Sequence, residues 1–86
     1  MEIYSRGSIV LSLAGRDSGR LFVILELRDN YALIADGRFH RIEKPKLKKL
    51  KHLSVKAADN IGEKPTNAEL RRLTEKYNIN LNEKEE

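Results

Sequence analysis

The chain has 86 residues, no cysteine and a formal net charge of +4. This length suits one small domain, and the missing cysteines exclude disulfides, thiolate metal sites and a cysteine nucleophile. The uninterrupted apolar runs are too short for a signal peptide or a membrane span. We therefore expect a cytoplasmic monomer that has no membrane partner.

The N-terminal part of the chain is typical of short strands separated by turns. Imperfect alternation of apolar and polar residues predicts a strand over residues 8–13, and the run RLFVILELR predicts a second strand over residues 20–28. The second run is almost continuously apolar, so both of its faces should be covered for part of its length. Asp29-Asn30 predicts a turn into a third strand over residues 31–35.

A short loop with two glycines separates the first two strands. Gly15 and Gly19 allow the backbone a tight turn, and Arg16 and Arg20 lie next to them. A guanidinium group can bind phosphate through two hydrogen bonds or stack on a base. The loop is therefore a candidate nucleic-acid contact, although its glycines are equally consistent with a simple turn. Asp17 is interpreted as a loop-forming residue.

After the third strand, the turn pair Asp36-Gly37 predicts a hairpin and a fourth strand over residues 38–42 that ends before Pro45. A leucine then recurs at every third position, which predicts one or two turns of 3₁₀ or α-helix with the leucines packed inward. These leucines are Leu47, Leu50 and Leu53. A fifth strand over residues 53–56 would close the sheet. Short strands joined by tight turns predict a mainly β fold, a small SH3-like barrel over residues 1–56.

Positive charge is concentrated in residues 38–56, which contain eight basic residues and one acidic residue, a net charge of +7. A basic patch predicts an anionic partner such as nucleic acid, whereas a solvated surface is the ordinary alternative for a run of charges. The candidate contacts are Arg38, Arg41, Lys44, Lys46, Lys48, Lys49 and Lys51.

The C-terminal part of the chain is predicted to be a linker and a helix. Residues 57–65 form the linker, and Thr66 and Glu69 fit a capping box at the start of a helix over residues 66–78. Residues 79–86 are predicted to be a frayed acidic tail. The helix should bury one face, which carries Leu70, Leu73 and Tyr77.

Other chemistry-bearing residues are few. His40 and His52 alone are too few ligands for a metal site without thiols or a carboxylate cluster. No set of base, nucleophile and metal ligands indicates an enzyme, so we expect neither catalysis nor a cofactor. Tyr31 and Phe39 are candidates for stacking on bases, but packing in the core is the favoured interpretation for both.

The order of these features resembles the KOW motif of ribosomal and transcription-elongation proteins. The resemblance depends on Gly7 before the first strand, Gly15 and Gly19 around the loop, and the run LFVIL. The sequence ALIADG, followed by a basic stretch that ends in LKHL at residues 50–53, is similar to the archaeal and eukaryotic large-subunit ribosomal protein of the L-fourteen-e type. It is similar also to the small bacterial KOW-domain relatives of that family. The resemblance covers residues 6–55.

This resemblance implies an SH3-like barrel that docks on RNA through its glycine loop and basic patch, with Gly15, Arg16, Gly19 and Arg20 at the contact. The implied partners are ribosomal or other structured RNA, together with ribosomal proteins. The chain lacks the long basic extensions of the ribosomal proteins, which favours a ribosome-associated accessory role. The alternative is an SH3-like protein–protein interaction module of the translation or transcription machinery.

Overall fold

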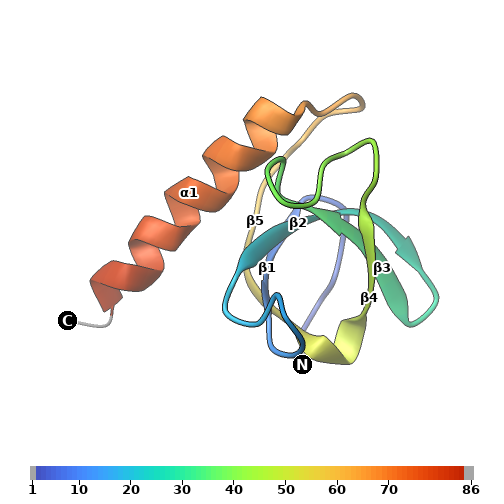
Figure 1. Ribbon diagram of the computed structural model, residues 1–86, viewed down its shortest axis with the longest axis horizontal. Coiled ribbons are helices and arrows are strands. Elements are labelled where there is room, and N and C mark those ends of the chain that lie inside the picture. Colours follow the sequence, from blue (N-terminus) through green and yellow to red (C-terminus); the bar gives the residue numbers. More distant parts are fainter. Residues whose placement is uncertain (1, 85–86) are drawn as a thin grey trace.

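The structure is a computed structural model that describes residues 2–84, with side chains described as far as residue 78. It contains one antiparallel sheet of five strands in the order β4-β3-β2-β1-β5, and a helix that lies beside the sheet (Figure 1). The strands are β1 (Ser8–Ser12), β2 (Leu21–Arg28), β3 (Tyr31–Ala35), β4 (Lys46–Lys49) and β5 (Leu53–Ala58). A short 3₁₀ helix, η1 (Leu50–His52), joins β4 to β5, and the α-helix, α1, spans Asn67–Lys84.

The predicted mainly β fold with a C-terminal helix is therefore confirmed. The sheet is strongly curled, so that its two edge strands follow one another through η1 (Figure 1). Within the described residues β4 and β5 do not pair with each other, so the sheet stays open. A closed SH3-like barrel is not confirmed.

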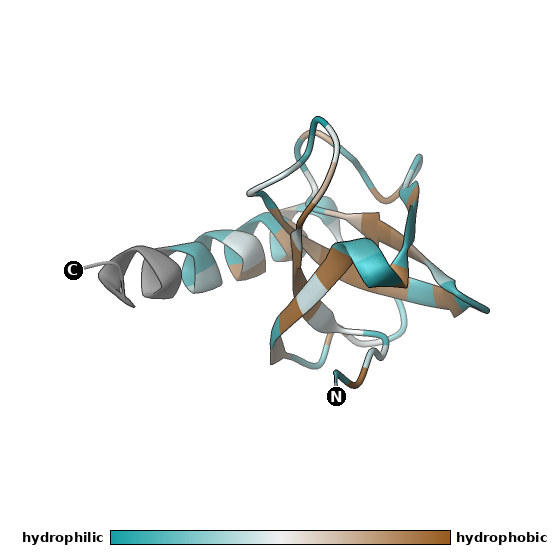
Figure 2. Ribbon diagram, turned by 90° about the horizontal axis from the view of Figure 1, so that it is seen from below, coloured by the Kyte–Doolittle hydropathy of each residue, from teal (hydrophilic) through white to brown (hydrophobic). Residues whose placement is uncertain are grey.

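Apolar side chains cover both faces of the sheet, and apolar residues concentrate in its strands (Figure 2). Successive residues of a strand point to opposite faces. In β2, Phe22 and Ile24 therefore join one buried cluster, whereas Leu21 and Val23 join a second cluster that includes Leu70 of α1. The first four residues of β2 are all buried, which confirms the prediction that both faces of this run are covered for part of its length.

Helix α1 packs on the second cluster through the predicted apolar face. Leu70 is fully buried, and Leu73 and Tyr77 pack beside it. The capping box forms as predicted, since the backbone N–H of Glu69 donates to Thr66 Oγ1 at 3.1 Å and that of Thr66 donates to Glu69 Oε1 at 3.3 Å.

The helix continues beyond the predicted end at residue 78 as far as Lys84, so the predicted frayed tail is wrong over residues 79–84. Residues 85 and 86 lie outside the described part of the chain. In the part that the structure describes, no helix combines the length and the apolar character that crossing a membrane requires.

The segment after β3 differs from the prediction. Residues 36–45 form an irregular loop, so the expected hairpin at Asp36-Gly37 and the expected strand over residues 38–42 are wrong. The physical reason is that the buried carboxylate of Asp36 accepts hydrogen bonds from the backbone N–H groups of Arg38 at 3.0 Å and His40 at 2.9 Å. This local turn replaces the strand pairing that a hairpin would need.

The next strand begins after Pro45, within the segment that was predicted to be helical. Residues Lys46–Lys49 pair with β3, with Leu47 opposite Leu33. Leu47 is 49% exposed, whereas Leu53 is buried, so the leucines do not form one inward-facing helical stripe. Only η1 has the expected helical conformation, and the predicted fifth strand extends two residues further, to Ala58.

Candidate nucleic-acid interface

The glycine loop, residues 13–20, has the backbone geometry that its two glycines predict. Gly15 has φ of 78° and Gly19 has φ of 88°, both in the left-handed region that favours glycine. The backbone N–H of Gly19 donates to the carbonyl of Ser12 at 2.8 Å, which closes the loop at its base. Arg16 and Arg20 are both exposed, so their side chains are accessible to a ligand.

The carboxylate of Asp17 connects the glycine loop to β4 and to the loop over residues 36–45. It is 8% exposed, accepts a hydrogen bond from Lys46 Nζ, and lies 3.4 Å from His40 Nε2. The hydrogen bond from Lys46, with a smaller contribution from His40, holds the pKa of the Asp17 carboxyl below its ordinary value despite its burial. The sequence offered only a loop-forming role for Asp17, because its partners follow it by more than twenty residues.

A second lysine of β4 also supports the glycine loop. Lys48 is 8% exposed, and its Nζ donates to the carbonyl of Ala14 at 2.7 Å. The register places Lys46 opposite Ile34 of β3, and Ile34 belongs to the buried cluster that contains Phe22 and Ile24. Lys46 and Lys48 therefore extend from the face of β4 that is turned toward this cluster. The structure therefore places Lys46 and Lys48, two of the predicted nucleic-acid contacts, where they hold the loop in position.

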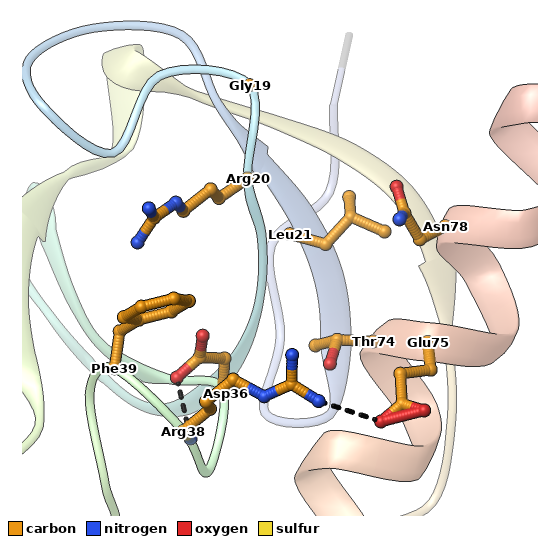
Figure 3. Close-up of a pocket in the computed structure, with 9 residues that line it drawn as sticks. All are labelled: Gly19, Arg20, Leu21, Asp36, Arg38, Phe39, Thr74, Glu75 and Asn78. Atoms are coloured by element: carbon orange, nitrogen blue, oxygen red, sulfur yellow. Dashed lines mark hydrogen bonds and ion pairs between the residues drawn. The ribbon is translucent and has the colours of Figure 1, made fainter.

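Phe39 lies at the surface, next to the glycine loop. Its side chain is 58% exposed, so the favoured interpretation that it packs in the core is wrong. The guanidinium carbon of Arg20 lies 3.9 Å from the centre of the Phe39 ring (Figure 3). This distance is typical of a cation–π contact. Tyr31 is half-buried in β3.

Phe39 forms a wall that is common to two hollows. The smaller has a volume of about 180 Å³ and lies between the loops and α1, where Arg38 is paired with Glu75 at 3.2 Å (Figure 3). The larger has a volume of about 570 Å³, and its lining residues are Phe39, His40, Arg41, Lys44, Pro45 and Lys46. A third hollow of about 380 Å³ lies further along β4 and is lined by Asn30, Tyr31, Lys49, Leu50 and Lys51.

Apart from the buried Lys48, the predicted cations fall into two groups by their ionic partners. Three of them are paired with carboxylates: Arg38 with Glu75, Lys46 with Asp17, and Arg41 with Glu43 at 3.4 Å. Five exposed cations form no ion pair with any described residue, and these are Arg16, Arg20, Lys44, Lys49 and Lys51.

The basic patch of the sequence is thus divided among three places. Some of its residues line the hollows beside Phe39, two lysines contact the glycine loop, and two more line the hollow beside Tyr31. The one local sign in the sequence that Phe39 belongs to this site was its position within RFHR, between Arg38 and Arg41.

The chain matches no model of a known protein family, and it matches no curated protein sequence.

Proposed function

We propose that this protein binds RNA on the surface formed by the glycine loop and residues 36–45. The observation that carries the proposal is the exposed ring of Phe39, which has Arg20 against it and Arg41 and Lys44 beside it. Proteins that bind single-stranded nucleic acid combine aromatic rings, on which bases stack, with cations that neutralise the phosphates. This surface supplies both groups within one area.

The exposed cations that form no ion pair are the candidates for the phosphate contacts. Arg20 and Lys44 are the nearest to Phe39, and Lys49 and Lys51 extend the charge along β4 and η1. Lys46 and Lys48 act indirectly in this scheme, because they keep the glycine loop in place.

The choice of RNA over DNA depends on the resemblance of residues 6–55 to KOW-motif proteins. The same resemblance supports association with the ribosome, and hence a cytoplasmic location. Sedimentation of the protein with ribosomes in a sucrose gradient, at low and at high salt, tests this part of the proposal. We expect the protein to sediment with ribosomes at low salt and to dissociate at high salt. Sedimentation as free protein at low salt would contradict ribosome association and leave RNA binding to be judged separately.

The salt dependence of RNA affinity tests the binding itself. If the five unpaired cations each neutralise one phosphate, the plot of log K against log salt has a slope of about −3.5 for single-stranded RNA, since each phosphate contributes about −0.7. Lys44→Gln should make this slope less steep by about 0.7, because it removes one of these contacts.

Lys56→Gln is the matched control, because it removes the same charge from an exposed position on β5, outside the two loops. It should leave the slope unchanged. Fluorescence anisotropy of a labelled RNA measures all three slopes. A wild-type slope near zero, or equal effects of the two variants, would contradict the proposed surface.

A further inference from the structure

We infer that Phe39 binds an unpaired RNA base by stacking, so that the protein prefers single-stranded or looped RNA to a regular duplex. This inference rests on the proposed RNA-binding function and adds the kind of RNA that the surface accepts. The large hydrophobic side chains that are exposed among the described residues are Ile3, Leu13, Leu27, Phe39 and Leu47, and Phe39 alone among them has an aromatic ring.

The loop presents the Phe39 ring on a backbone that is held on both sides. The Asp36 carboxylate accepts hydrogen bonds from the N–H groups of Arg38 and His40, the residues immediately before and after Phe39. Further along the loop, the N–H of Ile42 donates to Asn67 Oδ1 of α1 at 2.8 Å. A binding group that is already ordered loses little conformational entropy when the ligand arrives. The helix therefore contributes to the interface by supporting the loop that carries the ring.

The two hollows beside Phe39 differ in their suitability for a base. Arg20 contacts the ring and lines the smaller hollow, whose volume of about 180 Å³ is below the usual range of about 300–1,000 Å³ for ligand pockets. The larger hollow, of about 570 Å³, lies within that range, and Arg20 does not line it. The base is therefore placed in the larger hollow, where it stacks on Phe39.

The larger hollow also offers positive charge for the phosphates that flank the base. Lys44 has no ionic partner among the described residues. Arg41 forms an exposed ion pair with Glu43, in which Arg41 Nε lies 3.4 Å from Glu43 Oε1. Exposed pairs of this kind contribute little free energy, so a phosphate can replace the carboxylate. A regular A-form duplex keeps its bases stacked and its deep groove closed to side chains, and therefore offers Phe39 no base face.

The test compares a short unstructured RNA with a blunt RNA duplex of the same length. Phe39→Leu keeps an apolar side chain but removes the aromatic face, and because the ring is exposed the variant should fold as the wild type does. We expect its affinity for the unstructured RNA to fall by about 5- to 150-fold, with an unchanged salt slope and an unchanged affinity for the duplex. Phe39→Trp should retain the wild-type affinity, because tryptophan supplies an equivalent stacking surface.

Tyr31→Leu is the aromatic control, because it removes a half-buried ring that lines neither of the two hollows beside Phe39. It should change the affinity for the unstructured RNA by less than about twofold. Equal binding by wild type and Phe39→Leu, an equal loss on the duplex, or a loss in Tyr31→Leu alone would each overturn the stacking role of Phe39. Failure of the wild type to bind either RNA at low salt would instead overturn the proposed function. Binding of an acidic peptide in that case would assign the surface to protein recognition.

Discussion

Replacement of Gly37 by alanine tests whether α1 is fixed against the loop that carries Phe39. Gly37 has φ of 78°, and a Cβ atom added to it would lie 2.1 Å from the backbone carbonyl oxygen of Asn67, the first residue of α1. Neither backbone can move away without displacing the loop or the start of the helix. Gly19 is the matched control, since it has φ of 88° and a Cβ there would meet nothing within 4 Å.

The two variants share two contributions to the free energy of unfolding. The left-handed conformation costs an alanine about 1–2 kcal/mol, and the less flexible unfolded chain offsets about 0.4–1 kcal/mol of this. Gly37→Ala adds an overpacking cost of about 1–3 kcal/mol that Gly19→Ala does not have. We therefore expect Gly37→Ala to be less stable than Gly19→Ala by about 1–3 kcal/mol, out of a total stability of about 4–13 kcal/mol for a chain of this length.

Urea unfolding followed by circular dichroism measures this difference. With a denaturant dependence of about 1 kcal/mol per molar urea, the midpoint of Gly37→Ala should lie about 1–3 M below that of Gly19→Ala. Equal midpoints would show that the loop and the helix are not in close contact, and would refute the reasoning. Comparison of the two alanine variants cancels the backbone and unfolded-chain terms that either comparison with the wild type would include.

Two further predictions concern the residues that hold the glycine loop. The pKa of Asp17 is lowered in the folded protein, mainly by the hydrogen bond from Lys46, so the ionised carboxylate stabilises the folded state. This contribution to the free energy of unfolding is present above the unfolded pKa of about 3.9 and is lost as the pH falls through the lower folded value. The urea midpoint should therefore fall more between pH 7 and pH 3 in the wild type than in Asp17→Asn, and equal falls would contradict this. Lys48→Gln should lower the midpoint at pH 7 because it removes a buried hydrogen bond, whereas Lys49→Gln should preserve the midpoint and weaken RNA binding. The opposite assignment of these two effects would show that Lys48 contacts the ligand.

The parts of the fold that were predicted from sequence are those that local patterns determine. The run RLFVILELR is almost continuously apolar and rich in β-formers, and the strand predicted over residues 20–28 forms as β2, Leu21–Arg28. The Asp29-Asn30 turn connects it to β3, with Asp29 in the left-handed conformation at φ of 53°. The capping box at Thr66 was equally local, because both of its partners lie within four residues.

The parts that were missed depend on contacts between distant segments. Asp36-Gly37 has the composition of a hairpin turn, but the approach of α1 and the hydrogen bonds of the Asp36 carboxylate produce a loop instead. Phe39 would ordinarily be assigned to the core, and its exposure follows from the path of that loop. The contact of Asp17 with Lys46 joins residues that are 29 positions apart, and no local pattern indicates it.

The open sheet leaves β4 as an edge strand, and its composition bears on the solubility of the protein. Edge strands carry unpaired backbone groups that can pair with another chain and start aggregation. Three of the four residues of β4 are lysines, and the strand is short, both of which oppose such pairing. At the other edge, the carboxylate of Glu2 accepts a hydrogen bond from the N–H of Val55 in β5. Neutralising several lysines of β4 together would thus expose a strand edge to self-association as well as remove charge, so single substitutions are the safer probes of RNA binding.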